Sequence, residues 1–137
     1  MTALTLTHAP SPSRTGSGSE FLAGQYFSDR GYRVVERNYR AKRGELDLIV
    51  EKGEALAFVE VRYRKSEAFG APAETVTRSK QRKLSLAALE FVAERGGEDK
   101  CLRFDVLAMA RRGAELAFEH FENAFEPDFS GGATAWI

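Results

Sequence analysis

The segment GELDLIVEKGEALAFVEVRYR (residues 44–64) constrains the fold of this chain more than any other. Two apolar runs flank the turn signal Lys52-Gly53, and the second run is apolar on both faces at its beginning. This pattern predicts a β-hairpin whose second strand is central in a sheet covered on both sides. Each strand nevertheless carries an acid in apolar surroundings, Asp47 in the first and Glu60 in the second.

The hydrophobic periodicity of the rest of the chain predicts two helices and three more strands. The helices are expected over residues 19–30 and 77–95, the strands over 32–38, 102–110 and 115–121. The resulting order, α-β-β-β-α-β-β, favours an α/β fold with one sheet flanked by helices. The long second helix permits a crossover into a parallel fourth strand, which would make the sheet mixed.

Length and composition favour one domain with a substantial core, because the chain has 137 residues of which 43% are hydrophobic. Residues 1–16 are rich in Ser, Thr and Pro and are expected to form a disordered tail. The folded domain is expected over 17–125, with a C-terminal tail over 126–137. A single cysteine, no signal-peptide pattern and no apolar run near the ~20 residues of a membrane helix predict a cytoplasmic protein without a membrane partner.

The register of the hairpin decides how its acids lie relative to one another. A two-residue turn at Lys52-Gly53 would pair Glu51 with Glu54, Glu45 with Glu60 and Asp47 with Phe58. Glu60 would then lie diagonally beside Asp47, roughly 7–8 Å away at the backbone. Both acids would share one face of the sheet with Glu45 and Arg62, because side chains alternate with period two.

Two interpretations of these acids remain open on periodicity alone. Buried carboxylates that lie close together are costly, and a divalent cation such as Mg²⁺ or Mn²⁺ relieves that cost. Such an ion could polarise a phosphodiester and generate hydroxide for in-line attack. The alternation of Glu60 and Arg62 with valines is also typical of a strand with one solvated face and ordinary Glu–Arg pairs, and periodicity by itself favours that simpler interpretation.

The motifs GELDLIV, FVEVRYR, VTRSK and RFDV, spread over about residues 17–125, resemble the YraN-like family of small bacterial proteins. That family is similar to the archaeal Holliday-junction resolvases and to the PD-(D/E)xK nuclease superfamily. The resemblance implies a restriction-endonuclease-like fold with an αβββαβ core. It also implies a divalent-metal-dependent endonuclease that acts on DNA, including branched or flapped structures, and it permits a homodimer.

The resemblance assigns roles by position. Asp47 corresponds to the metal-binding acid of the superfamily, Glu60 to the acid of the (D/E)xK element, and Glu20 to an extra acid of resolvase-like members. These three would hold Mg²⁺ or Mn²⁺, while Asp47, Glu60 and Arg62 would be the catalytic residues. Arg62 departs from the motif because it occupies the lysine position. Arginine keeps a positive charge near the phosphate but does not give up a proton.

Positive charge is clustered, although the net charge is zero. One basic stretch precedes the acidic strand and ends at Arg43, and another begins at Arg62 and continues past Lys80. If both border one cleft, they would form a track for the phosphates of nucleic acid, DNA more than RNA. The residues expected in that track are Arg43, Arg64, Lys80 and Gln81. The alternatives are solvated charged faces and, for Lys80, a side chain whose stem covers the core.

Two other functional classes compete with a nuclease. One is a module of the same fold that binds nucleic acid without cleaving it. The other is a protein-interaction adaptor that uses Phe125, Phe129 and Trp136 near the C-terminus. Asp105 is expected to pair with Arg103 rather than to perform chemistry.

Overall fold

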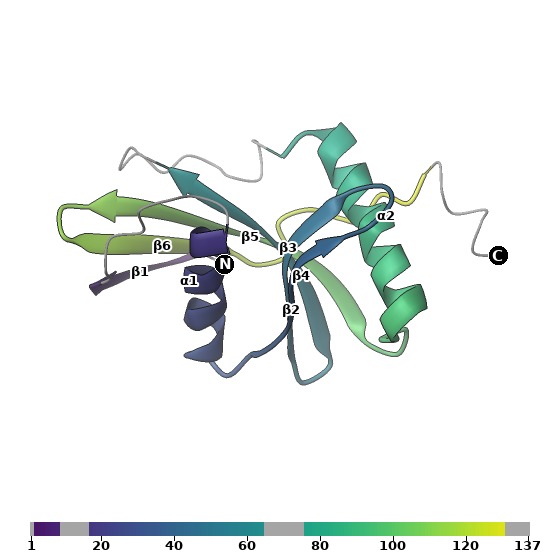
Figure 1. The fold of residues 1–137 in the computed structure, drawn as a ribbon, viewed down its shortest axis with the longest axis horizontal. Coiled ribbons are helices and arrows are strands. Elements are labelled where there is room, and N and C mark those ends of the chain that lie inside the picture. The colour runs from purple at the N-terminus through teal and green to yellow at the C-terminus, as the bar shows by residue number, and fades with distance from the viewer. Residues whose placement is uncertain (1, 9–16, 65–75, 131–137) are drawn as a thin grey trace.

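A computed structural model describes residues 2–8, 17–64 and 76–130 of the chain. It contains two helices and one six-stranded sheet with strand order β1-β6-β5-β4-β3-β2 (Figure 1). The elements, in chain order, are β1 (Thr2–His8), α1 (Ser17–Ser28), β2 (Arg33–Arg40), β3 (Glu45–Lys52), β4 (Ala55–Arg64), α2 (Arg78–Arg95), β5 (Cys101–Arg112) and β6 (Glu115–Phe121). The predicted fold class, an α/β fold with a mixed central sheet flanked by helices, is confirmed.

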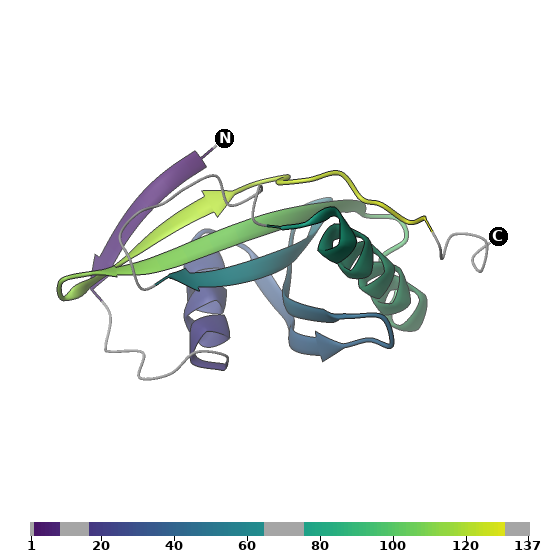
Figure 2. The same ribbon diagram turned by 90° about the horizontal axis from the view of Figure 1, so that it is seen from above.

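The sheet is mixed because β4 and β5 are parallel whereas every other neighbouring pair is antiparallel. Helix α2 lies between β4 and β5 in the chain, as the sequence predicted for a crossover connection. Strand β4 is therefore central, with β3 on one side and β5 on the other. Figure 2 shows the strands from above, with the two helices beside the sheet.

The two helices cover opposite faces of the sheet. Alternate residues of β4 belong to two separate hydrophobic clusters: Ala57 and Val59 pack with α1, whereas Leu56 and Phe58 pack with α2. Because successive strand residues point to opposite faces, this separation places one helix on each face. A strand buried on both faces explains why the beginning of β4 is apolar throughout.

Strand β1 is a departure from the expected disordered tail. Thr2–His8 pairs antiparallel with β6 over its whole length and forms one edge of the sheet. Its sequence, TALTLTH, alternates threonine with leucine in its second half, which suits a strand. The Ser, Thr and Pro content of the longer stretch obscured this short alternation, and residues 9–16 lie outside the described part of the chain.

The register of the β3–β4 hairpin differs from the one predicted. Lys52 pairs with Ala55 and Glu51 with Leu56, so the two-residue loop is Gly53-Glu54 and not Lys52-Gly53. The predicted pairs Glu51–Glu54, Glu45–Glu60 and Asp47–Phe58 are therefore wrong by two residues. The physical reason is the backbone of Gly53, whose φ of 59° suits the first position of a two-residue hairpin loop.

Helix α2 begins at a side-chain cap. The Thr77 hydroxyl accepts a hydrogen bond from the backbone N–H of Lys80 at 3.1 Å, which fixes the first turn. The helix ends at Gly96, whose φ of 92° is unfavourable for residues with a side chain. Neither helix in the described ranges is long and apolar enough to cross a membrane.

Candidate functional site

Asp47 and Glu60 lie just beyond the end of the β3–β4 ladder. The last backbone pair at this end is Leu48 with Val59, and Asp47 and Glu60 are the next residues of their strands. Here the Asp47 carboxylate accepts a hydrogen bond from the backbone N–H of Val61 at 2.9 Å. The charge of Glu60 acts on Asp47 and both side chains line one cavity, so the two acids lie near each other beyond the paired part of the hairpin.

The electrostatic environment of Asp47 disfavours its charged form. Burial is the main cause that raises the pKa of Asp47, and the neighbouring charge of Glu60 raises it further, to about 7. The charge of Glu20 acts in the same direction, while the hydrogen bond from Val61 and the charge of Lys80 oppose the shift. Asp47 therefore holds a proton, or requires a nearby cation, close to neutral pH.

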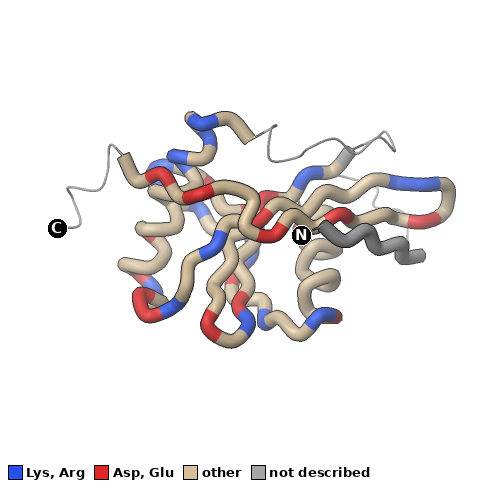
Figure 3. Tube along the Cα trace, turned by 180° about the vertical axis from the view of Figure 1, so that it is seen from behind, with Lys and Arg blue, Asp and Glu red and all other residues tan. Residues whose placement is uncertain are grey.

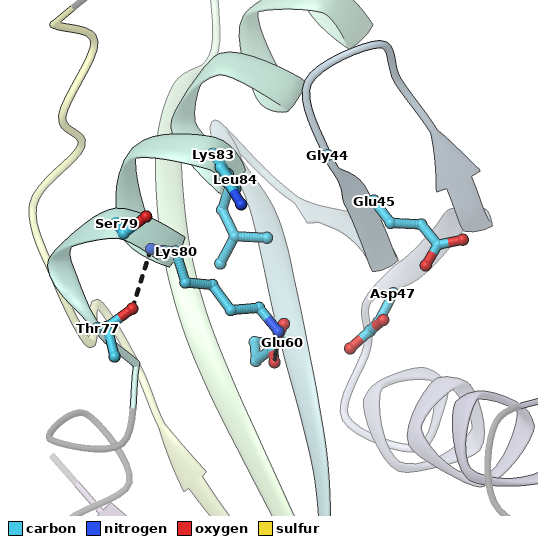
Figure 4. Close-up of a pocket in the computed structure, with 9 residues that line it drawn as sticks. All are labelled: Gly44, Glu45, Asp47, Glu60, Thr77, Ser79, Lys80, Lys83 and Leu84. Atoms are coloured by element: carbon cyan, nitrogen blue, oxygen red, sulfur yellow. Dashed lines mark hydrogen bonds and ion pairs between the residues drawn. The ribbon is translucent and has the colours of Figure 1, made fainter.

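Glu60 is buried, with 6% of its side chain exposed, and two cations compensate its charge. The Lys80 ammonium lies 2.9 Å from Oε2 of Glu60, and Nε of Arg62 lies 3.3 Å from the same oxygen. Figure 4 shows the Lys80 side chain reaching from the first turn of α2 to Glu60. Two predicted site residues, Arg62 and Lys80, therefore form ion pairs with the predicted acid Glu60.

Glu20 lies in the first turn of α1, and its side chain is buried. Burial raises the pKa of Glu20, and the charge of Glu45 raises it further. Because Glu20 also contributes to the shift of Asp47, helix α1 and strand β3 bring their acids into mutual electrostatic range. An acid in the first turn also suits the positive end of the helix dipole.

These residues border a cavity of about 370 Å³ between α2 and the beginning of β3. Figure 4 shows Glu45 and Asp47 on one side of it and the first turns of α2 on the other. The lining residues are Gly44, Glu45, Asp47, Glu60, Thr77, Ser79, Lys80, Lys83 and Leu84. Sequence reasoning included Lys83 only as a member of the second basic stretch and gave Thr77 and Ser79 no role in the site; their positions in the first turns of the helix that carries Lys80 could have indicated them.

Both basic stretches of the sequence reach this cavity, although part of their charge is used internally. Arg43 is exposed and directly precedes Gly44, while Lys80 and Lys83 line the cavity from α2. Arg40 pairs with Glu45 at 3.3 Å. Figure 3 shows basic and acidic positions alternating along much of the trace rather than separating into two halves.

Two other predicted nucleic-acid contacts have different positions. The side-chain amide of Gln81 donates to the carbonyl of Val76 at 2.8 Å, so it supports the start of α2. The side chain of Arg64, at the end of β4, lies outside the described residues. The roles of these residues in binding remain predictions.

The acids fit a hard divalent cation in chemical type but are not arranged around one. Carboxylate oxygens are suitable ligands for Mg²⁺ or Mn²⁺, and burial together with the charge of Glu60 raises the pKa of Asp47, so a cation beside it would stabilise its charged form. In the described part of the chain, however, no three acidic, His or Cys side chains converge closely enough to hold an ion. In this arrangement Lys80 and Arg62 both form ion pairs with the Glu60 carboxylate.

A second buried acid, Asp105, lies in a hydrogen-bond network that has a structural role. Its carboxylate accepts hydrogen bonds from Arg103 at 2.8 and 2.9 Å, which confirms the predicted pair, and from the backbone N–H of Asn123. His120, to which sequence reasoning gave no role, lies 2.8 Å from it. Burial would raise the pKa of Asp105, but these hydrogen bonds outweigh that effect and hold it below its usual value.

The C-terminal aromatic residues proposed for an adaptor are less available than expected. Phe125 is half-buried and stacks on Phe104 with ring centroids 5.2 Å apart, so it completes the core on the α2 side. Phe129 is also partly buried. Trp136 lies outside the described residues.

The order α1-β2-β3-β4-α2-β5, with acids of β3 and β4 lining one cavity, defines a protein of the restriction-endonuclease-like α/β class. Residues 19–109 match the model of a family described as "Uncharacterised protein family UPF0102". The chain belongs to this family, which is the YraN-like family that its motifs resemble. The predicted family membership is therefore confirmed.

Relatives of similar length support this assignment. The chain is 43% identical over 113 residues to a UPF0102 protein of Anaeromyxobacter dehalogenans, covering 82% of this chain and 84% of the relative. It is 42% identical over 111 residues to one of Rhodococcus jostii, covering 80% and 94%. It is 42% identical over 123 residues to one of Pelobacter propionicus, covering 88% of each. The names of these relatives state the family and no activity.

Proposed function

We propose that the protein is a divalent-metal-dependent endonuclease that hydrolyses phosphodiester bonds of DNA, including branched or flapped DNA. The observation that carries the proposal is that Asp47 and Glu60 line one cavity together with Lys80 and Lys83. A buried and a half-buried carboxylate within electrostatic range of each other are costly, and a cation and a phosphate in the cavity would offset that cost. The restriction-endonuclease-like fold supports the proposal by analogy only.

Asp47, Glu60 and Glu20 are the residues that would hold Mg²⁺ or Mn²⁺. When bound, the ion would supply Lewis-acid polarisation of the phosphate and an activated water. Lys80 and Arg62 would bind the phosphate oxygens, because both already lie at Glu60 and would be released when a cation compensates that carboxylate. Asp47 would release its proton on cation binding, since burial and the charge of Glu60 raise its pKa to about 7 and a bound cation would favour the charged carboxylate.

A cleavage assay tests the proposal. End-labelled flapped, nicked and four-way DNA is incubated with the full chain and Mn²⁺, and Asp47→Asn and Glu60→Gln are compared with the wild type. The expected result is cleavage by the wild type, with a loss of at least a hundredfold in each variant while DNA binding persists. Glu54→Gln is the matched control, because Glu54 is exposed in the hairpin turn at the opposite end of β3 and β4.

A second candidate is a module that binds DNA without cleaving it. The specific observation in its favour is that Glu60 already has two cationic partners, one of which, Arg62, replaces the lysine of the superfamily motif. This candidate predicts DNA binding without cleavage at any Mn²⁺ concentration. It also predicts that Arg62→Lys, which restores the motif, confers no cleavage.

We propose the cytoplasm as the working compartment, since Cys101 is a free and exposed thiol. DNA is the expected partner rather than RNA or a membrane surface, and a homodimer is the expected assembly if the protein cuts both strands of a junction. Sedimentation of the free protein and of its DNA complex measures that stoichiometry.

A further inference from the structure

We propose that Phe21 and Arg37 form a platform that stacks an unpaired base of DNA next to the acidic site. The inference rests on the proposed function for its substrate, and it specifies which DNA structure the site prefers. Among the described residues, Phe21 is the large apolar side chain that stands out as exposed, with 57% of its surface accessible. A single exposed apolar side chain is ordinary, so the observation that points to a ligand is the guanidinium of Arg37 over this exposed ring.

The position of Phe21 ties it to the site. It directly follows Glu20, whose charge acts on Asp47, so the ring lies on α1 one residue from a predicted metal ligand. Arg37 lies on β2 directly opposite Leu48, the residue after Asp47. Phe21 is therefore adjacent in sequence to Glu20, and Arg37 pairs with the residue that follows Asp47.

Arg37 is available to a ligand. Its guanidinium carbon lies 5.9 Å from the centroid of the Phe21 ring, and the residue is exposed. Within the described ranges, no carboxylate forms an ion pair with Arg37, whereas Arg33, Arg40, Arg95 and Arg103 each have an acidic partner. An arginine beside an aromatic ring can bind a phosphate while the ring stacks on the attached base.

Gly24 allows this arrangement. It lies one turn after Phe21 on α1, and a Cβ at this position would be 2.9 Å from Nη2 of Arg37. The absent side chain lets the guanidinium lie across the helix near the ring. A glycine inside a helix is unfavourable, so its presence is consistent with a need for this close approach.

Unpaired nucleotides fit the platform better than paired ones. A base within a duplex is already stacked on its neighbours, whereas a base at a flap or a junction offers a free face to an aromatic side chain. Because stacking on aromatic rings tolerates every base, the platform would select DNA structure and not sequence. This assigns to α1 the recognition of the branch and to the β3–β4 acids the chemistry.

Fluorescence binding tests the platform without requiring cleavage. The probe is a flapped duplex with 2-aminopurine at the first unpaired position, titrated with the full chain in EDTA. The wild type should quench the fluorophore and bind the flap more tightly than the fully paired duplex. Phe21→Ala should lose the quenching and about tenfold of the flap affinity, Phe21→Trp should retain both, and paired-duplex affinity should not change.

Gly24→Ala is a second variant, which displaces the Arg37 guanidinium without removing an exposed ring, and it should weaken flap binding severalfold. Thermal unfolding checks that each variant is folded. Equal flap affinity and quenching in the wild type and Phe21→Ala would overturn the platform, whether or not the protein cleaves DNA. Flap selectivity that depends on Phe21 in a protein that never cleaves would support the platform and refute the nuclease.

Discussion

The ammonium of Lys80 lies 2.9 Å from Oε2 of Glu60, so the first turn of α2 is joined to β4 by an ion pair whose acidic half is almost fully buried. Within residues 2–8, 17–64 and 76–130, Asp47 forms no ion pair, and burial and the charge of Glu60 raise its pKa. The cavity is therefore lined by one carboxylate paired with cations and one that is not.

Lys80→Met should lower the free energy of unfolding by about 1 kcal/mol in metal-free buffer, because it leaves the buried Glu60 with Arg62 alone. The loss is smaller than for a fully buried pair, since 47% of the Lys80 side chain is exposed. Urea unfolding measures it. Lys83→Met is the matched control in the same cavity and should change stability little; an equal loss in both variants would contradict the ion pair's contribution.

The pKa of Asp47 makes stability depend on pH. With a pKa of about 7 in the folded state against 3.8 as the ordinary value, the folded protein binds a proton that the unfolded chain releases between those values. The contribution of Asp47 to stability is therefore complete below about pH 4 and is lost as the pH rises towards 7. The loss is at most about 4 kcal/mol, because each pKa unit between 3.8 and about 7 corresponds to roughly 1.4 kcal/mol.

Asp47→Asn isolates this effect from the other titrating groups. The difference in unfolding free energy between wild type and Asp47→Asn should shift in favour of the variant from pH 4 to pH 7 and become constant above about pH 8. Denaturant unfolding at four or five pH values measures this difference. A difference that does not vary with pH would show that Asp47 titrates normally.

The Asp105 network should be purely structural. Asp105→Ala would leave the partly buried Arg103 without its buried carboxylate partner, and it should cost about 3 kcal/mol or more of stability. Glu122→Ala removes the exposed partner of the same arginine and should cost roughly 0–1 kcal/mol. Chemical denaturation compares the two, and similar losses would contradict the assignment of Asp105 as the central acceptor.

Gly44 should be required for close packing of β3 against α2. A Cβ at Gly44 would lie 3.1 Å from the carbonyl oxygen of Lys83, which is backbone and moves little. Gly44→Ala should therefore lower stability by about 1 kcal/mol. Gly24→Ala is the contrasting case, because the nearest atom belongs to a flexible guanidinium and helix propensity should offset part of the displacement; thermal unfolding of both variants tests this difference.

Strong periodicity made most of the fold predictable, and local backbone geometry limited the rest. The strand alternation around Asp47 and Glu60 placed both acids on one hairpin, and parity kept them on one face even though the register was wrong by two residues. In the observed loop, Gly53-Glu54, the positive φ falls on the glycine at the first position. The preference of hairpin turns for glycine at that position could therefore have selected the correct register. No such local rule relates distant segments.

The partners that come from distant segments could not be derived from spacing. The contact of His120 with Asp105 and the position of Arg37 over the Phe21 ring both depend on how separate elements pack. Lys80 was an intermediate case, because the helix period placed it on the apolar face but only the packing of α2 showed that it reaches Glu60. Strand β1 was missed because a short alternation was read within a longer polar stretch.

Calorimetric titration with Mn²⁺ tests the central claim, that Asp47 and Glu60 bind a divalent cation, most directly. At pH 7, in two buffers of different ionisation enthalpy, the wild type should bind Mn²⁺ and release roughly half a proton, because about half of Asp47 is protonated there. Asp47→Asn and Glu60→Gln should each bind at least tenfold more weakly, and Asp47→Asn should release no proton from this position. Identical titrations for the wild type and both variants would contradict the metal site and the nuclease mechanism that depends on it.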